Sequence, residues 1–324
     1  MSFPFNFYLA AFAGAFLTTL LALPLWRKWC LRTGQVDDPG RRKIHARPVP
    51  LAGGPAVLTG LVLPLIFGAV LLKLGGFKNF FASPITHGFS RRGMELGAIA
   101  FGAVAMTAIG WLDDRRELRP LPKFTGQLLV AALVAAAGAR ITLFVPSVVF
   151  SYAVTMLWML TLVNAFNFMD NMNGLCGGLG AIAAFQFAVV AAVSGQYLVA
   201  LIAFLTCGAL LGFLPYNFPR AAAFLGDAGS HLTGYLLAVL AILPHFYTAK
   251  NPHPLAVLTP LLLLAVPLGD LAWVVVLRWR AGRPFYVGDT NHLSHRLVRL
   301  GWSRTRAVLV IWLLAAALGA IAFI

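Results

Sequence analysis

Charged residues are scarce in this chain, and acidic residues are the scarcest among them. Of its 324 residues, 11% are charged and ten are Asp or Glu, whereas 60% are hydrophobic. A soluble domain of this length needs a more polar surface than that composition supplies. Apolar runs of about 20 residues, enough to cross a hydrocarbon core about 30 Å thick, recur from end to end. The scarcity of charge therefore excludes an ordinary soluble protein and predicts an all-α integral membrane protein.

Cysteine pairs and linker-like stretches are also missing from the sequence. The three cysteines, Cys30, Cys176 and Cys207, are widely spaced and form no Cys-x-x-Cys pair. Neither a zinc site nor a disulfide framework is therefore indicated. No stretch rich in Gly and Ser, or in Pro, divides the chain. We expect residues 1–324 to form a single polytopic membrane domain.

Hydropathy divides the chain into about ten candidate transmembrane helices, because a helix satisfies its own backbone polar groups in lipid. They lie near residues 5–26, 51–72, 95–112, 125–143, 147–166, 174–193, 197–214, 231–247, 255–277 and 306–323. The first run lacks a basic leader and a small-residue cleavage site. We therefore expect a retained helix there rather than a signal peptide.

The distribution of basic residues predicts the orientation. An N-terminus outside places five connections inside: 27–50, 113–124, 167–173, 215–230 and 278–305. Counting Arg306 at a helix end, that side holds 19 of the 25 Lys and Arg residues, as the positive-inside rule requires. We predict a multi-pass protein of the bacterial inner membrane with both termini outside. The same bias explains the net charge of +15 without nucleic acid, because basic loops attract anionic membrane lipids.

Acidic residues gather on the same side as the basic ones. Nine of the ten fall in the inner connections or in the inward half of the ninth run, and Glu95 lies outside. This arrangement indicates a reaction at the membrane surface rather than a conduction path. A secondary transporter would show repeat symmetry, broken helices and polar groups near mid-membrane, and this sequence shows none of these features clearly. A lipid-binding scaffold would need no acids at five inner sites.

The first inner connection carries a basic cluster. Arg42, Lys43, His45 and two neighbouring arginines are suited to the phosphate groups of a lipid or a nucleotide. The alternative is a loop that only sets the topology. Gly53 and Gly54 open the next run, which indicates a close approach of two backbones.

The second inner connection carries an acidic pair at the end of an apolar run. Adjacent residues on a helix face different ways, whereas residues four apart, such as Asp113 and Glu117, share a face. Asp113 and Asp114 should therefore have different roles, unless the helix unwinds there. Lys123 and Gln127 repeat the spacing of four at the start of the next run. The alternative interpretation is that these acidic side chains only form the polar contacts that a helix end needs.

The third and fourth inner connections carry oxygen ligands. Asn164, Asn167, Asp170 and Asn173 recur every three residues, and such groups hold a hydrated divalent ion or a sugar-nucleotide hydroxyl. Polar helix packing is the alternative. Asp227 lies between glycines just before the next run, where it could coordinate Mg²⁺ while helix N-terminal amides approach phosphate. An ordinary helix cap would look similar.

The last inner connection contains His292, His295 and Arg296. These side chains could contact a diphosphate, with His292 and Arg296 four residues apart on one helical face. A His-x-x-His pair without a third ligand is a weak indication of zinc.

Together, and in this order, the five motifs resemble those of the polyprenyl-phosphate N-acetylhexosamine-1-phosphate transferases, glycosyltransferase family 4. The resemblance covers most of the chain, from Gly34 to Gly301. It implies a bundle of transmembrane helices with the active site on the cytoplasmic face, and dependence on Mg²⁺, with Mn²⁺ as a substitute. It also implies that a polyprenyl phosphate attacks the sugar-linked phosphate of a UDP-sugar and releases UMP.

The family resemblance implies roles for individual residues. Its catalytic residues match Asp113, Asp114, Asp170 and Lys123, with Lys123 as the lysine that holds the carrier phosphate. Asp227 matches the magnesium-binding aspartate, and Asp170 could share the ion. The residues expected to bind substrate are Arg42, Lys43, His45, Asn164, Asn167, Asn173, Glu117, His292, His295 and Arg296.

One branch of the family is the phospho-N-acetylmuramoyl-pentapeptide transferases. Two departures from the motifs of that branch narrow the choice of UDP-sugar donor. Glu117 stands where that branch usually has lysine, and residues 292–296 lack its run of histidines followed by an acid. Both features look more like the branch that uses UDP-N-acetylglucosamine. We expect transfer of N-acetylglucosamine-1-phosphate to undecaprenyl phosphate as the first membrane step of cell-surface glycan synthesis. Another UDP-sugar and a secondary transporter are the alternatives, and the protein could be a homodimer.

Overall fold

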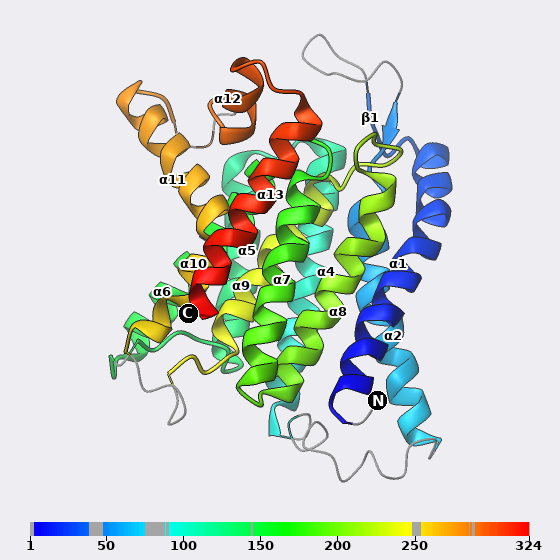
Figure 1. The fold of residues 1–324 in the computed structure, drawn as a ribbon, viewed down its shortest axis with the longest axis vertical. Helices are drawn as coiled ribbons and strands as arrows, with labels where there is room; N and C mark the ends of the chain where they lie inside the picture. The colour runs from blue at the N-terminus through cyan, green and yellow to red at the C-terminus, as the bar shows by residue number, and fades with distance from the viewer. Residues whose placement is uncertain are drawn as a thin grey trace.

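Long apolar helices make up nearly all of the regular structure in the computed structural model (Figure 1). The structure describes residues 3–38, 48–74, 88, 91–143, 145–247, 254–284, 286 and 289–323. Within these ranges the extended segments are β1 (Val36–Asp37) and β2 (Val49–Pro50), which pair antiparallel with Val36 opposite Pro50. The expected all-α class is confirmed.

Each of the ten predicted apolar runs overlaps at least one helix. The α-helices are α1 (Phe5–Thr33), α2 (Gly53–Lys73), α4 (Gly93–Arg116), α5 (Pro120–Ala136), α6 (Val148–Met169), α7 (Leu175–Val193), α8 (Tyr197–Phe213), α9 (Gly226–Ile242), α10 (Thr259–Leu263), α11 (Ala265–Arg280), α12 (Leu293–Arg299) and α13 (Arg304–Ala320). Short 3₁₀ turns are η2 (Leu214–Tyr216), η3 (Pro254–Leu258) and η4 (Ile321–Phe323).

Seven of the helices in the described residues are long and apolar enough to cross a membrane, so the chain is a multi-pass membrane protein. The ninth predicted run could supply an eighth span, but it is broken at Leu264, where the two parts bend by 76°. α5 and α9, at 17 residues each, are shorter than a usual span. The structure therefore does not confirm the count of ten.

The break at Leu264 corrects the sequence-based expectation that the chain has no broken helix. Proline lacks a backbone N–H, and its ring collides with the carbonyl group four residues earlier. Pro267 stands four residues after Leu263, and Leu263 is the last residue of α10. The chain therefore stops one helix and starts another in a new direction.

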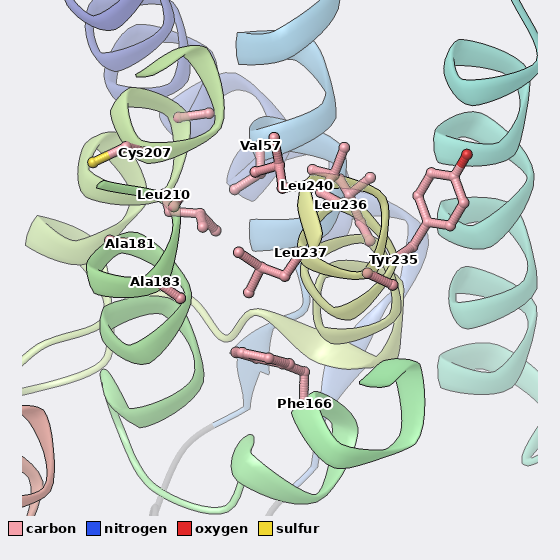
Figure 2. Packing of buried hydrophobic residues seen from close by; sticks show 14 of the residues in the cluster. Val57, Phe166, Ala181, Ala183, Cys207, Leu210, Tyr235, Leu236, Leu237 and Leu240 are labelled. Carbon is pink, nitrogen blue, oxygen red and sulfur yellow. The ribbon is translucent and has the colours of Figure 1, made fainter. Parts of the chain in front are cut away.

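α9 forms the centre of the bundle and packs against α2, α4, α6, α7 and α8. Nearly all of its residues are buried. In Figure 2, Leu237 of α9 faces Leu210 of α8 and the small side chains of Ala181 and Ala183 on α7. Tyr235 points toward α4, where its hydroxyl donates to the Ile99 carbonyl oxygen at 2.9 Å. Tight packing thus fixes α9 among its neighbours.

The start of α9 is also held by the start of α2. The backbone N–H of Gly53 donates to Phe224 O at 2.9 Å, and that of Gly54 donates to Leu225 O at 3.0 Å. A Cβ atom on Gly54 would lie 2.5 Å from the backbone nitrogen of Gly229. The close backbone approach predicted for the glycine pair is therefore confirmed.

One end of the bundle collects the connections that the sequence places inside. β1 and α12 lie at this end in Figure 1, whereas the N-terminus lies toward the opposite end. The polar residues of five separate segments are thereby brought to one surface.

Candidate active site

All five connections that the sequence predicts to lie inside contribute residues to one open cavity of about 910 Å³. Its lining includes one residue from each connection in turn: Asp37, Asp113, Phe168, Asp227 and Tyr286. A second wall is apolar and comes from α6 and α11, with Leu157, Leu160, Leu271 and Val275. The volume and the mixed lining fit an organic ligand with a charged group.

Lys123 joins two carboxylates in the cavity. Its Nζ atom lies 2.6 Å from Asp113 Oδ2 and 3.3 Å from Asp227 Oδ2. Asp113 comes from the end of α4, Lys123 from the start of α5 and Asp227 from the start of α9. Residues of two predicted motifs, on three helices, therefore converge at one ammonium group. Its charge offsets the repulsion between the two carboxylates.

The Asn-rich motif reaches the same group through one of its residues. Asn167 donates from Nδ2 to Asp227 Oδ1 at 2.7 Å and to Ser230 Oγ at 3.0 Å. Its Oδ1 accepts from Lys123 Nζ at 3.4 Å. Asn164, one turn earlier, donates to Gln127 Oε1 at 2.9 Å. Both asparagines line the cavity, and their predicted role in substrate binding stays a prediction.

Asp113 and Asp114 do have different environments, as the helix periodicity predicts. α4 remains helical to Arg116, so the two side chains diverge. Asp114 accepts the backbone N–H groups of Asp227 and Ala228 at 2.8 and 3.1 Å. It therefore fixes the N-terminus of α9, whereas Asp113 faces Lys123.

The turn before α9 depends on a glycine. Gly226 has a φ of 71°, in the left-handed region that glycine tolerates best. A Cβ atom there would lie 2.7 Å from Asp114 Oδ2. The Gly-Asp sequence thus lets Asp114 approach the backbone while Asp227 projects toward Lys123.

Asp170 is partly buried and accepts a hydrogen bond from the backbone N–H of Gly226. Burial, together with the nearby charge of Asp227, raises the pKa of its carboxyl group to about 7. Asp170 is not among the described residues that line the cavity. Its predicted catalytic and metal-binding roles remain predictions.

His231 also belongs to this site, although no motif in the sequence indicated a role for it. It follows Asp227 by four residues on α9 and is fully buried. Its Nε2 atom lies 3.4 Å from Gln127 Nε2. The spacing of four from Asp227 was visible in the sequence, but the distance to α4 was not.

One group of side chains at the cavity has the geometry to hold a metal ion. Among the described residues, ligand atoms of Asp113, Asp227 and His231 all lie within 4.8 Å of one another. Two carboxylates and an imidazole are a common donor set for such ions. The buried Nδ1 atom of His231 also has no hydrogen-bond partner within the described part of the chain. Asp170 is not in this set.

Of five further residues predicted to bind substrate, the structure describes two, Glu117 and Asn173. Glu117 ends α4 in a left-handed conformation, with φ of 45°, and lines the cavity. Asn173 points elsewhere and donates to the Pro219 carbonyl oxygen at 3.3 Å. The basic cluster predicted to bind phosphate lies outside the described residues. Its predicted members are Arg42, Lys43 and His45.

The histidine motif is built into the fold beside the cavity. His292 Nδ1 lies 2.6 Å from Asp270 Oδ2, and the other oxygen of Asp270 accepts the backbone N–H of Leu293 at 2.6 Å. Ser294 donates to Asn171 Oδ1 at 2.6 Å. One buried carboxylate of α11 therefore holds both the ring of His292 and the start of α12.

The other basic residues near α12 are also engaged. The guanidinium of Arg296 lies 4.9 Å from the ring centroid of Trp273. Arg278 donates from Nε to Asp289 Oδ2 at 2.8 Å. The described lining of the cavity does not include His292, His295 or Arg296. Their predicted contact with a diphosphate remains a prediction.

Comparison with known proteins gives the family of this chain. A profile for glycosyl transferase family 4 matches residues 96–245. A protein from Bacillus subtilis, named as a probable undecaprenyl-phosphate N-acetylglucosaminyl 1-phosphate transferase, is 30% identical over 94% of this chain and 81% of its own length. The chain belongs to glycosyl transferase family 4.

Two other members of this family are similar over comparable lengths. A decaprenyl-phosphate N-acetylglucosaminephosphotransferase from Mycobacterium tuberculosis is 36% identical, covering 94% of this chain and 79% of the relative. An undecaprenyl-phosphate alpha-N-acetylglucosaminyl 1-phosphate transferase from Escherichia coli is 29% identical over 94% of this chain and 80% of its own. The family and the branch predicted from the motifs are therefore confirmed.

Proposed function

We propose that this enzyme transfers N-acetylglucosamine-1-phosphate from UDP-N-acetylglucosamine to a polyprenyl phosphate and releases UMP. The observation that carries the proposal is the position of Lys123 between Asp113 and Asp227, in a cavity to which all five motif-bearing connections contribute. The names of the similar proteins from three bacteria agree on this sugar phosphate and on this class of lipid acceptor.

The chemistry joins two anions, so positioning and charge neutralisation must dominate catalysis. An oxygen of the lipid phosphate forms a bond to the phosphorus that carries the sugar. The bond from that phosphorus to the bridging oxygen breaks, and its electron pair leaves with UMP. Lys123 is the cation placed to hold the attacking phosphate.

The acidic residues have separate parts in this proposal. Asp113, Asp227 and His231 would hold Mg²⁺ or Mn²⁺, an ion whose chemistry is to neutralise charge on the diphosphate and on the departing UMP. Asp113 also orients Lys123 through their 2.6 Å contact. Asp114 keeps Asp227 in place by accepting the N–H groups at the start of α9.

The apolar wall supports a lipid acceptor. Leu157 and Leu160 on α6 and Leu271 and Val275 on α11 extend the cavity with hydrocarbon. A polyprenyl chain can lie against such a surface while its phosphate reaches Lys123. We further propose that this end of the bundle faces the cytoplasm of a bacterial cell, because the basic residues of the sequence concentrate there.

The deciding experiment measures UMP release by the purified chain in detergent, with undecaprenyl phosphate and radiolabelled UDP-N-acetylglucosamine. We expect UMP and labelled lipid in equal amounts, and loss of both after EDTA treatment. Parallel reactions with UDP-N-acetylgalactosamine and UDP-N-acetylmuramoyl-pentapeptide test the choice of donor. Absence of lipid-dependent UMP release would overturn the proposal. Uptake of a solute into vesicles without UMP release would favour a transporter instead.

A further inference from the structure

The fully buried His231 is placed for a role beyond packing. Residues four apart on a helix lie on one face, so Asp227 and His231 project from α9 in the same direction. Asp113 reaches toward them from α4, and ligand atoms of all three residues lie within 4.8 Å. Two packed helices therefore bring together two carboxylates and one imidazole.

The surroundings of His231 leave its imidazole available to a ligand. No ion pair joins it to a carboxylate in the described part of the structure. Its Nδ1 atom is buried without a hydrogen-bond partner among the described residues. Because Oε1 of Gln127 accepts from Asn164, the Nε2 amide group of Gln127 faces Nε2 of His231, at 3.4 Å. A cation bound at Nε2 would replace this long contact, and Nδ1 would keep the proton of the neutral ring. A neutral ring with an available nitrogen is the form of histidine that binds metal ions.

The separations suit an ion after a small adjustment. In octahedral coordination with bonds of about 2.1 Å, neighbouring and opposite ligand atoms lie roughly 3 and 4 Å apart. The three groups, within 4.8 Å of one another, need to move inward by about 1 Å or less. Lys123, now 2.6 and 3.3 Å from the two carboxylates, would yield its place and turn to the acceptor phosphate.

An imidazole in this set changes which cation the site prefers. Mg²⁺ favours oxygen ligands, whereas first-row transition ions accept imidazole nitrogen. We propose that His231 is a nitrogen ligand to the catalytic cation and shifts the preference of the site from Mg²⁺ toward Mn²⁺. This inference rests on the proposed function, because that function supplies the need for a cation at Asp227.

Pulsed electron paramagnetic resonance tests the nitrogen ligand directly. Mn²⁺ is added to the purified full chain in nanodiscs, and the modulation from ¹⁴N nuclei bound to the ion is recorded. We expect histidine nitrogen coupling in the unmodified chain and its loss in His231→Leu. The affinity for Mn²⁺ should fall by about tenfold or more in that variant. The affinity for Mg²⁺, measured by competition, should change about threefold or less.

His245→Gln is the matched control. His245 lies away from the cavity, where its backbone contacts the side chain of Gln196, and this variant should keep the nitrogen coupling. If His231→Leu does not fold, His231→Gln keeps a polar side chain of similar length and should also lose the coupling. Coupling that is absent from the unmodified chain, or that survives in a folded His231 variant, overturns the inference. UMP release without nitrogen coupling removes only the role of His231, whereas no UMP release with either ion removes the proposed function.

Discussion

Two polar clusters at the same end of the bundle use their charges in different ways. The cavity cluster consists of Asp113, Lys123, Asn167, Asp227 and His231. The α12 cluster consists of Asp270, Arg278, Asp289, His292 and Ser294. Both Asp227 and Asp270 use their two carboxylate oxygens within the protein, but the Asp227 side chain is 34% exposed, whereas that of Asp270 is 1% exposed. The first cluster can exchange its partners for a ligand, and the second cannot without local unfolding.

The contrast separates residues that react from residues that hold the site. A buried carboxylate with two short hydrogen bonds stabilises the fold, because removal of either partner would leave a buried charge without compensation. An accessible carboxylate beside a lysine can instead bind a cation or release the lysine to a phosphate. Activity should therefore depend most on the cavity cluster, and stability most on the α12 cluster.

Asp227→Asn should have the largest effect on activity. The change removes charge where the diphosphate and its cation must be neutralised, so kcat should fall about a thousandfold. Thermal unfolding should change little, because the repulsion between Asp227 and the neighbouring acids also disappears. Asp289→Asn makes the same chemical change in the α12 cluster and should lower kcat less than tenfold. Equal losses in the two variants would contradict the division between the clusters.

Lys123→Met should lower kcat/KM about a hundredfold, mainly through a higher KM for the polyprenyl phosphate. The reason is the position of Lys123 Nζ between two carboxylates at the cavity, where it is the cation placed for the acceptor. Steady-state UMP release at varied lipid concentration measures the effect. Lys123→Arg retains the charge and should recover part of the affinity. An unchanged KM for the lipid, with an altered KM for the UDP-sugar, would reassign Lys123 to the donor.

Asp270→Asn should affect stability more than chemistry. The amide can accept one hydrogen bond through its oxygen but cannot match a carboxylate that holds both His292 and the start of α12. The free energy of unfolding should fall by about 2 kcal/mol, measured by thermal unfolding in detergent. The matched control is Glu95→Gln, which weakens the more exposed pair with Arg92 at 3.8 Å and should change stability by about 0.5 kcal/mol or less. An equal shift in both variants would remove the special role of Asp270.

The smallest expected effect concerns pH and His295. Burial, with the nearby charges of His292, Arg299 and Arg304, lowers the pKa of this histidine below its ordinary value of 6.5. The unfolded chain therefore binds a proton more readily than the folded chain, and stability falls as the pH drops below about 6.5. His295→Gln should flatten the decrease in melting temperature between pH 7 and pH 5. An identical slope in the variant would assign the decrease to other groups.

Much of the site could be predicted from local patterns. The period of the helix correctly separated Asp113 from Asp114, because neighbouring residues on a helix must diverge. The glycine pair at Gly53 and Gly54 correctly indicated close packing, because a side chain would collide with α9. Both features could be predicted because neighbouring residues in the sequence carry the signal, although the partner of the glycine pair lies far away in the chain.

Other features depended on residues far apart in the chain. Pro267 was visible as a helix breaker, but the bend of 76° at Leu264 is a property of the folded chain. Asp270 looked like one more inward acid, although it is the partner of His292, which is 22 residues away. His231 gained its significance from Asp113, which reaches it across the packing of α4 against α9.

The sequence by itself determined that this protein lies in a membrane, that its polar residues gather on one side, and which motifs indicate its family. These follow from hydropathy, from the distribution of charge and from spacing along single helices. The tertiary structure decided which of the polar groups share the cavity and which form the hydrogen bonds and ion pairs that hold α12. The physical reason is that pairing depends on distances of 3 to 4 Å between helices, and no local pattern in the sequence encodes those distances.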